Sequence, residues 1–498
     1  MPTSEQRPNI LVICSDEHHP RIAGYRGNRW VKTPNLDGLA RDGAHFTRAY
    51  CTSPVCTPSR MSFISGKYVH QIDNWMIGIP LDRKEMTWPR RLDQAGMQTI
   101  MLGKMDFCGD YQDGGFSQHR ILRRRPAFAQ IPLPSPYAAR MPGYTRPDKR
   151  RHIRNVGARS SEIISDGGYI GEADDTIGNY DHDRLVTNWA VEALRNLGQR
   201  GQQAPWALFV GLLQPHWPFR VPEPYASMYL PDAYDWPVEA LFPNGRLHPA
   251  LQTFQRGLDL GTVTEEMLRK VLATYYGMVT CLDDMIGEML AALEAAGQAD
   301  NTHVIYTSDH GESLGEHGLF YKQCAYEGSV GVPLILRGPG ITAGEACDWP
   351  VSLVDLYPTI LDMAGLEAED DCPGTSWLPL LRGETEGRPD WAFSEFHGNF
   401  FPDDWFMLVR DRFKYVHYVN HAPSLFDIDA DPREINDLAA RTEYADTLRA
   451  FAELLQSLLD PVAVSQRAKR DLGLIDAQGR DWTQGEKGCS DPAPDAWA

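Results

Sequence analysis

Short apolar runs rich in β-branched residues recur along the N-terminal part of the chain, separated by segments with helical periodicity. The runs are residues 9–14, 98–102, 207–213, 303–307 and 333–336. This alternation is typical of βαβ units and predicts a mainly parallel sheet with flanking helices. Residues 268–293 repeat apolar side chains at helical spacing, which predicts a core-facing crossover helix that is ended by Gly297.

Side chains with catalytic or ligating chemistry follow four of these five predicted strands. They are Asp16 and Glu17, Lys104, His216, and Asp309 and His310. In sheets of this kind, ligands bind beyond the carboxyl ends of the strands. Four coincidences at one sheet edge therefore predict a single functional site.

The pattern changes after about Gly374. Residues 405–410, 413–418 and 424–428 are predicted to be antiparallel strands, and residues 444–459 an amphipathic helix. We therefore expect an α/β domain at 1–375, a smaller α+β domain at 376–460, and a tail or oligomerisation arm at 461–498. Residues 120–178 are rich in Pro, Gly and Arg and predict a long excursion over the site.

Composition narrows the classes of partner. The net charge of −19 argues against nucleic acid or an anionic membrane as partner, and no stretch approaches the roughly 20 apolar residues of a membrane helix. One basic stretch could contact an anionic substrate, although such a run of charges is more often only exposed to solvent. It comprises Arg120, Arg123, Arg124, Arg125, Lys149, Arg150, Arg151 and Arg154. The polar start and nine scattered cysteines without a CxxC pair predict a cytoplasmic protein with reduced thiols.

The most informative segment is Cys56-Thr57-Pro58-Ser59-Arg60. Thr57 is a plausible N-cap and Pro58 suits the first helical position, so a helix is predicted from there. Cys56 then lies at a helix N-terminus near Arg60, where negative charge is favoured. This suits a reactive thiol or an oxyanion, although a buried cysteine that opens an ordinary helix has the same local pattern.

The pentapeptide resembles the Cys-x-Pro-Ser-Arg signature of type I sulfatases, in which the cysteine is oxidised to formylglycine. Other segments are similar to the family's blocks, from the N-terminal strand through Ser308-Asp309-His310-Gly311-Glu312 to Lys322 and the C-terminal Arg412-Phe413-Lys414-Tyr415-Val416. The resemblance covers roughly residues 8–440 and points to the branch that contains choline sulfatase and phosphonate monoester hydrolases. It implies an alkaline-phosphatase-like fold with a large, mainly parallel mixed sheet.

The resemblance also implies one divalent metal ion beside the formylglycine. Its expected ligands are Asp16, Glu17, the formylglycine from Cys56, Asp309 and His310. An oxygen-rich cluster with one imidazole suits Ca²⁺ first, with Mn²⁺ or Mg²⁺ as alternatives. The family usually has Asp or Gln where Glu17 stands. Glu17 is therefore expected either to bind the ion in a different way or to lie behind the residues that bind it directly.

The remaining catalytic assignments come from the same resemblance. Lys104 and Lys322 match the sulfate-binding lysines, His216 matches the histidine that protonates the leaving group, and Arg60 lies beside the nucleophile. Asp106 departs from the family, which usually has a histidine there. Either the carboxylate acts as the base or a histidine comes from elsewhere, and Asp106 is expected to pair with Lys104 or Arg60 or to contact a cationic part of the substrate.

We therefore predict a sulfuric ester hydrolase that acts on a small sulfate monoester. It would depend on a maturation enzyme that generates formylglycine and form a dimer or tetramer. A phosphonate monoester or phosphodiester hydrolase on the same scaffold is the nearest alternative. A silent anion-binding protein with an unmodified Cys56 is a second alternative, which the combination of nucleophile, proton donor and metal ligands disfavours.

Overall fold

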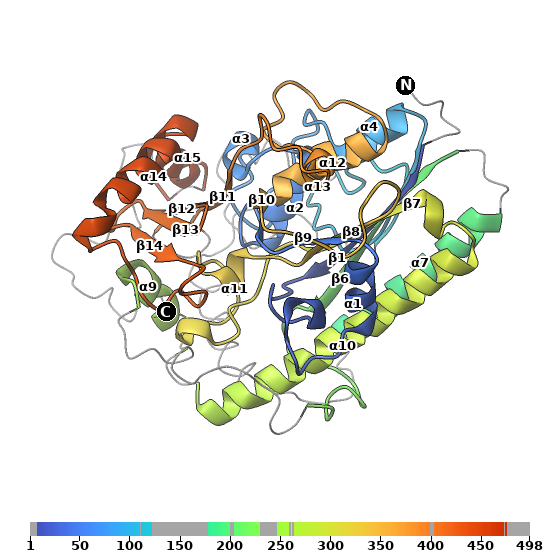
Figure 1. The fold of residues 1–498 in the computed structure, drawn as a ribbon, viewed down its shortest axis with the longest axis horizontal. Helices are drawn as coiled ribbons and strands as arrows, with labels where there is room; N and C mark the ends of the chain where they lie inside the picture. Colours follow the sequence, from blue (N-terminus) through green and yellow to red (C-terminus); the bar gives the residue numbers. More distant parts are fainter. Residues whose placement is uncertain are drawn as a thin grey trace.

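The computed structural model describes residues 7–109, 111–121, 178–199, 204–229, 247–257, 260, 263–398, 403–472 and 474–475. Its centre is an eight-stranded sheet in the order β5-β4-β6-β1-β7-β8-β2-β9 (Figure 1). The strands are β1 (Asn9–Asp16), β2 (Ala44–Phe46), β4 (Gln98–Gly103), β5 (Gln118–Arg120), β6 (Trp206–Pro215), β7 (Thr302–Ser308), β8 (Leu334–Arg337) and β9 (Glu345–Cys347).

All five predicted strands of the sheet are present. β6 and β7 flank β1 in parallel, and β4 pairs with β6 in parallel. β8 is antiparallel to both β7 and β2, so the sheet is mixed but mostly parallel, as predicted. Every residue of β1 and β6 is buried, which explains why these strands are continuous apolar runs without alternation.

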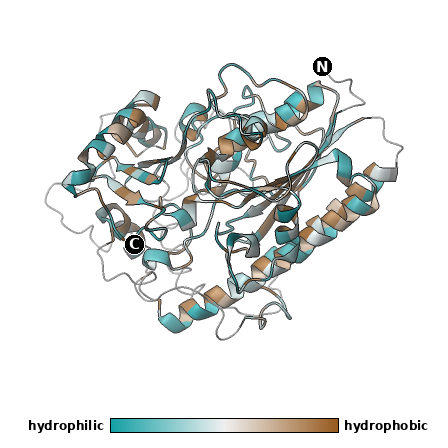
Figure 2. Cartoon of the chain, in the orientation of Figure 1, coloured by the Kyte–Doolittle hydropathy of each residue, from teal (hydrophilic) through white to brown (hydrophobic). Residues whose placement is uncertain are grey.

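Helices cover both faces of this sheet (Figure 1). α1 (Pro34–Arg41), α7 (Asn179–Gln199) and α10 (Glu265–Ala295) lie on one face; α2 (Cys56–Ser65), α4 (Trp88–Gln94), α12 (Leu356–Met363) and α13 (Trp377–Leu381) lie on the other. In Figure 2 the central strands are mostly brown, whereas the helices carry both colours. α10 is the predicted crossover helix, and Gly297, at φ 66°, follows its C-cap as expected.

A second sheet of four antiparallel strands occupies the C-terminal part: β11 (Trp391–Phe396), β12 (Trp405–Arg410), β13 (Phe413–Tyr418) and β14 (Ser424–Asp427). α14 (Ala445–Leu458) confirms the predicted amphipathic helix, whereas β11 was not anticipated. α15 (Pro461–Asp471) lies in the predicted tail, but Val464 and Ala468 are buried in the same apolar cluster as α14. This part of the tail is therefore packed structure, while residues 476–498 lie outside the described residues.

Smaller elements complete the described structure. They are β3 (Ala49–Tyr50), β10 (Val351–Ser352), α3 (Val69–Ile72), α9 (Pro249–Gly257), α11 (Glu327–Val330) and several single-turn 3-10 helices. Of the predicted excursion and basic stretch, residues 122–177 lie outside the described residues, and Arg120 stacks on Trp189 at 3.8 Å. Within the described ranges, no helix combines the length and apolar character needed to cross a bilayer.

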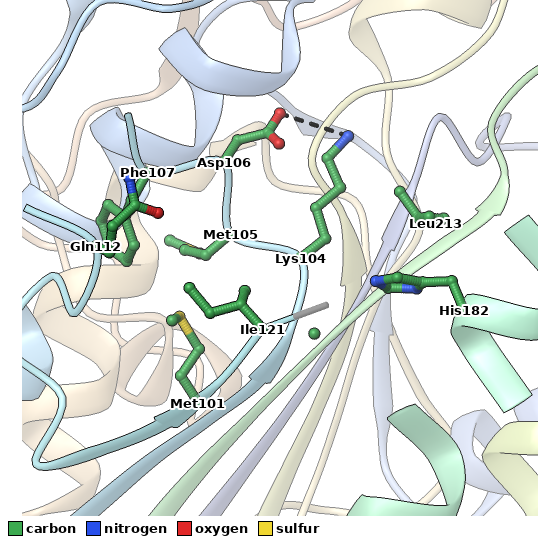
Figure 3. A pocket seen from close by; sticks show the side chains of 10 residues that line it. Met101, Lys104, Met105, Asp106, Phe107, Gln112, Ile121, His182 and Leu213 are labelled. Carbon is green, nitrogen blue, oxygen red and sulfur yellow. Dashed lines mark ion pairs between the residues drawn. The ribbon is translucent and has the colours of Figure 1, made fainter. Parts of the chain in front are cut away.

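A cavity of about 40 Å³ opens at the carboxyl end of β4 (Figure 3). Apolar side chains such as Met101, Phe107 and Ile121 line much of it, and Lys104 and Asp106 stand at one side. The cavity therefore lies at the sheet edge where the polar residues were predicted to converge.

Candidate active site

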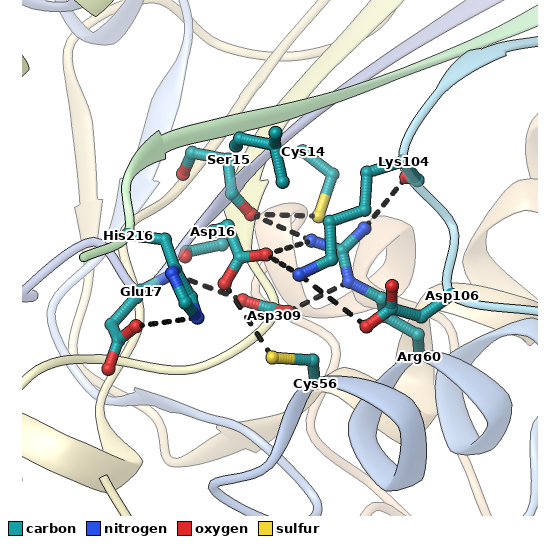
Figure 4. A network of polar contacts seen from close by, with 12 residues as sticks. Cys14, Ser15, Asp16, Glu17, Cys56, Arg60, Lys104, Asp106, His216 and Asp309 are labelled. Carbon is teal, nitrogen blue, oxygen red and sulfur yellow. Dashed lines mark hydrogen bonds and ion pairs between the residues drawn. The ribbon is translucent and has the colours of Figure 1, made fainter. Parts of the chain in front are cut away.

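The polar residues that follow the parallel strands meet at one edge of the sheet (Figure 4). Asp16 ends β1, Asp309 and His310 follow β7, and Lys104 and His216 follow β4 and β6. Both aspartates are fully buried and contact cationic side chains from other elements. The predicted convergence is therefore present.

Cys56 enters this cluster from α2. The helix begins at Cys56 with Val55 as N-cap, and no side chain caps it. The prediction that Thr57 is the N-cap was wrong, because Thr57 and Pro58 are already the second and third helical residues. Pro58 fits there because the first turn of a helix has no intrahelical partners for its N–H groups. The sulfur therefore lies at the positive end of α2, as expected.

Four side chains form a cluster with metal-ligating chemistry. One ligand atom each from Asp16, Cys56, Asp309 and His310 lie within 4.8 Å of one another. The Cys56 sulfur is 3.3 Å from Nε2 of His310 and 3.8 Å from Oδ1 of Asp16. Nδ1 of His310 lies 2.9 Å from the Gly311 carbonyl, to which it can donate, and this contact leaves Nε2 free to bind a cation.

Arg60 and Ser59, both on α2, contact the cluster through hydrogen bonds. Arg60 is fully buried, and its Nε donates to Oδ2 of Asp309 at 2.8 Å. Its Nη1 donates to the Lys104 carbonyl at 2.9 Å, and Nη2 lies 3.5 Å from Oδ2 of Asp16. The Ser59 hydroxyl donates to the Asp309 backbone carbonyl at 2.6 Å. Arg60 thus orients the two aspartates that could bind a cation and balances their charge.

The two predicted anion-binding lysines face the cluster from opposite sides. Lys104 contacts Asp16 and lies 3.4 Å from Asp106, while Lys322 lies 3.0 Å from Glu17 and 3.5 Å from the Cys56 sulfur. Burial would lower the pKa of each lysine, but neighbouring acidic groups raise it above its usual value: Asp106 and Asp16 for Lys104, and Cys56 and then Glu17 for Lys322. Both lysines therefore stay charged and can hold an anion.

Gly103 sets the direction of Lys104. Its φ is +84°, and a Cβ at this position would lie 2.1 Å from the Gly211 carbonyl oxygen. The backbone N–H of Lys104 donates to that same oxygen at 2.8 Å. Only glycine lets β4 approach β6 this closely while the chain turns toward the site.

Glu17 differs from the other predicted metal ligands. Its φ is +65°, and Oε2 lies 3.2 Å from Nε2 of His216 and 3.0 Å from Lys322. Glu17 lies within 4.8 Å of ligand atoms of Asp16 and His216, in a second group with metal-ligating chemistry that does not include Asp309 or His310. Burial raises its pKa to about 8 despite Lys322 and His216. Its carboxyl group is thus directed toward the lysine and the imidazole.

Charges from the lysines and histidine act on the central thiol. Burial and Asp16 would raise the pKa of Cys56, but Lys104, Lys322 and His310 lower it to about 6. The site therefore favours negative charge at this position, as the helix N-terminus alone predicted.

His216 stacks on Trp217, with ring centroids 5.2 Å apart and planes at 26°. Its Nδ1 contacts the Trp217 carbonyl, and its Nε2 lies 3.0 Å from Nζ of Lys322. Nε2 therefore points to the side of the cluster where Lys322 lies. Burial and Lys322 lower the pKa of His216 to about 4 in this arrangement.

Asp106 takes one of the roles expected for it, because it pairs with Lys104 across the site edge (Figure 3). Its φ of +62° turns the carboxylate back toward the lysine that precedes it by two residues.

Two buried acids near the site, Glu312 and Asp183, were not predicted from the sequence. Glu312 lies beside Glu17 and accepts the Leu314 N–H at 2.8 Å, and burial raises its pKa. Asp183, on α7, accepts two N–H groups from the segment before His216. Glu312 lay within the matched motif and could have been singled out, whereas an aspartate in the second turn of a helix, such as Asp183, gives no local signal.

The fold and this constellation define a hydrolase of the alkaline-phosphatase-like superfamily. A sulfatase profile matches residues 8–366, and a profile for the C-terminal part of N-sulphoglucosamine sulphohydrolase matches residues 315–460. The chain belongs to the sulfatase family, and it is a hydrolase that acts on sulfuric ester bonds.

Relatives agree with this assignment. Arylsulfatase K of Danio rerio is 32% identical over 492 residues, covering 94% of this chain and 87% of the relative. Arylsulfatase K of Homo sapiens is 29% identical over 482 residues, covering 92% and 83%. The phosphonate monoester hydrolase of Agrobacterium radiobacter superposes with a TM-score of 0.70 at 27% identity, covering 95% of this chain and 99% of that one.

Proposed function

We propose that this protein hydrolyses a sulfate monoester with a formylglycine made from Cys56 as nucleophile and one bound divalent cation. One observation carries the proposal: a buried cysteine at a helix N-terminus meets two aspartates and a histidine within 4.8 Å, between two charged lysines. A packing cysteine would not need this concentration of opposite charges, which is costly to bury.

The proposed cation ligands are Asp16, Asp309, His310 and the group at position 56. Three protein groups with mainly oxygen donors fit a hard cation, and we favour Ca²⁺ over Mn²⁺ or Mg²⁺. Glu17 is proposed as a neighbour rather than a ligand, because its carboxylate contacts Lys322 and His216. Such an ion supplies Lewis-acid chemistry and favours a deprotonated hydroxyl beside it.

The formylglycine hydrate carries two hydroxyl groups: one attacks sulfur and displaces the alcohol, and loss of the proton from the other expels sulfate and regenerates the aldehyde. Around it, Lys104 and Lys322 are proposed to bind the sulfate oxygens by exchanging their present carboxylate partners for the anion. Arg60 keeps Asp309 in place, and Asp106 orients Lys104. In the present arrangement Nε2 of His216 accepts from Lys322. His216 is proposed to take up a proton at Nε2 once the sulfate engages Lys322, and to donate it to the departing alcohol oxygen.

We also propose that a maturation enzyme converts Cys56 to formylglycine, that the protein forms a homo-oligomer, and that it is located in the cytoplasm. The cytoplasmic location is supported only by the eight described cysteines, which are all free thiols.

The test is mass spectrometry of the peptide that spans Cys56, on protein from its native host, together with turnover of an aryl sulfate and an aryl phosphonate monoester. We expect a loss of about 18 Da at Cys56, as for a thiol oxidised to an aldehyde, and preferred hydrolysis of the sulfate. An unmodified thiol in fully active protein would overturn the nucleophile assignment. Preferred hydrolysis of the phosphonate would favour the alternative that the Agrobacterium radiobacter structure represents.

A further inference from the structure

Asp183 is a fully buried carboxylate on α7 that bonds the chain just before His216. Its Oδ1 accepts the backbone N–H of Leu213 at 2.8 Å, and its Oδ2 accepts that of Gln214 at 2.7 Å. No part of the chemistry proposed above uses this residue. Each of its two oxygens thus accepts a hydrogen bond from one of the two residues that precede Pro215 and His216.

The position of these bonds follows from where the sheet ends. β6 pairs with β4 only as far as Gly211, and its pairing with β1 becomes irregular between Gly211 and Pro215. The N–H groups of Leu213 and Gln214 are therefore beyond the regular ladder but still buried. A buried N–H without a partner is costly, and the carboxylate of Asp183 replaces the missing strand.

Neighbouring residues of α7 strengthen the same connection. Nδ2 of Asn179 donates to the backbone carbonyl of His216 at 2.7 Å. Nδ1 of His182 lies 2.8 Å from Oδ1 of Asp183, and Figure 3 shows the His182 ring beside Leu213 on the cavity wall. The first turns of α7 thus contact the His216 segment both before and at the histidine.

We propose that Asp183 is a positioning residue for His216, holding Leu213 and Gln214 so that Nε2 of the imidazole meets the leaving-group oxygen. The inference rests on the proposed role of His216 as proton donor. Proton transfer needs heavy atoms within about 2.6–3.2 Å. Since displacement by about 1 Å can cost roughly 100-fold in rate, a shift of this segment weakens catalysis without removing any catalytic group.

The chain contains a matched control for this idea. Asp283, on α10, is also fully buried, and it accepts the N–H groups of Asn35 and Leu36 at 3.0 and 2.8 Å. Those residues belong to the first turn of α1, and within the described residues the hydrogen bonds of Asp283 go to Asn35 and Leu36 and to none of the catalytic residues proposed above. Asp183→Asn and Asp283→Asn therefore make the same chemical change, but only the first perturbs the segment that carries His216.

The experiment measures kcat/KM on aryl sulfates with progressively poorer leaving groups, ending with an alkyl sulfate, using metal-loaded, matured enzyme. We expect Asp183→Asn to lose about 10- to 100-fold on the poorest leaving group and less than about threefold on 4-nitrophenyl sulfate, because a good leaving group needs no proton. Asp283→Asn should leave the dependence on the leaving group unchanged. In a His216→Ala background, Asp183→Asn should cause no further selective loss.

The inference would be overturned if Asp183→Asn lowered kcat/KM equally on every substrate, or if it caused the same selective loss in the His216→Ala background. Asp183 would then be a packing residue. If His216→Ala itself shows no extra loss on poor leaving groups, the donor role of His216 fails first, and the inference fails with it. Asn179→Ala provides a second variant where Asp183→Asn does not fold. It should show the same selectivity with a smaller loss, and a uniform loss would again contradict the proposal.

Discussion

Lys104 and Lys322, the two lysines proposed to bind the sulfate, are held in position by different parts of the fold. Lys104 follows β4 directly, and its direction is set by Gly103 and the neighbouring strand β6. Lys322 lies in the irregular segment 311–326, between Tyr321 at φ 68° and Gln323 at φ 82°. Non-glycine residues in this conformation are costly, so the segment must be held by contacts outside itself.

The C-terminal sheet supplies these contacts. Nε1 of Trp405 on β12 donates to the Gln323 carbonyl at 3.0 Å, and Nζ of Lys414 on β13 donates to the Ala325 carbonyl at 2.8 Å. Glu434 accepts the backbone N–H of Glu327 at 2.7 Å. The contrast teaches that Lys104 is placed mainly by the central sheet and α2, whereas the position of Lys322 depends on the C-terminal part of the chain.

The largest expected effect comes from removing either lysine. Lys104→Ala and Lys322→Ala should each lower kcat by about 100- to 1000-fold, because each takes away a charge that stabilises the developing anion. Steady-state kinetics on an aryl sulfate checks this, with circular dichroism to verify folding. If only one variant lost activity, the view that both lysines hold the substrate sulfate would be untenable.

The same contrast explains how much could be read from the sequence. Asp16, Lys104, His216 and Asp309 follow predicted strands, and strand order alone brings them to one edge. Lys322 could be assigned only through the family resemblance, because neither left-handed neighbour is a glycine and no local pattern marks the segment.

Contacts between distant segments account for most of what the sequence did not reveal. Asp183 acts across a sheet edge on residues 30 and 31 positions away, and no periodicity encodes such a contact. β11 precedes the recognised hairpin and is defined by its pairing with β12. α15 is predominantly polar, and only its packing on the C-terminal sheet distinguishes it from a tail.

The second largest effect that we expect is on the pH dependence of stability, through a buried histidine where the C-terminal sheet contacts α3. His397 is buried between Glu395, 2.8 Å from its Nε2, and Asp404, 3.7 Å from its Nδ1, and Glu395 also contacts His70 of α3. Burial alone would lower the pKa of His397, but Asp404 and Glu395 raise it to about 9. A raised histidine pKa stabilises the folded state below about pH 6.5, and this contribution is lost as the pH rises through about 9.

We therefore expect the free energy of unfolding to fall by about 2–3 kcal/mol more in the wild type than in His397→Gln between pH 7 and pH 10. Urea denaturation at both pH values, followed by tryptophan fluorescence, measures the difference. Equal pH dependence in the two proteins would mean that His397 is not charged in the folded state.

A smaller effect on stability and on kcat is expected when a contact between the C-terminal sheet and the segment that carries Lys322 is removed. Trp405→Phe removes the hydrogen bond to Gln323 and should cost about 1 kcal/mol, with kcat reduced about fivefold. Trp377→Phe is the matched control, since the Trp377 indole donates to Asp355 at 3.2 Å, outside the contacts that hold the Lys322 segment. Equal kinetic effects of the two substitutions would argue against a specific role of the C-terminal sheet in the anion site.

The smallest expected effect concerns the start of α2. The Thr57 hydroxyl is buried and has no hydrogen-bond partner within the described part of the chain, and Val55 is the N-cap. Thr57→Val keeps the shape of the side chain and removes only the hydroxyl, so stability should change by less than about 0.5 kcal/mol, whereas loss of a true N-cap costs about 0.5–2 kcal/mol. Thermal denaturation of the two proteins distinguishes these values. A loss above 1 kcal/mol would restore Thr57 as the cap and move the start of α2 to Pro58, with Cys56 directly before the cap.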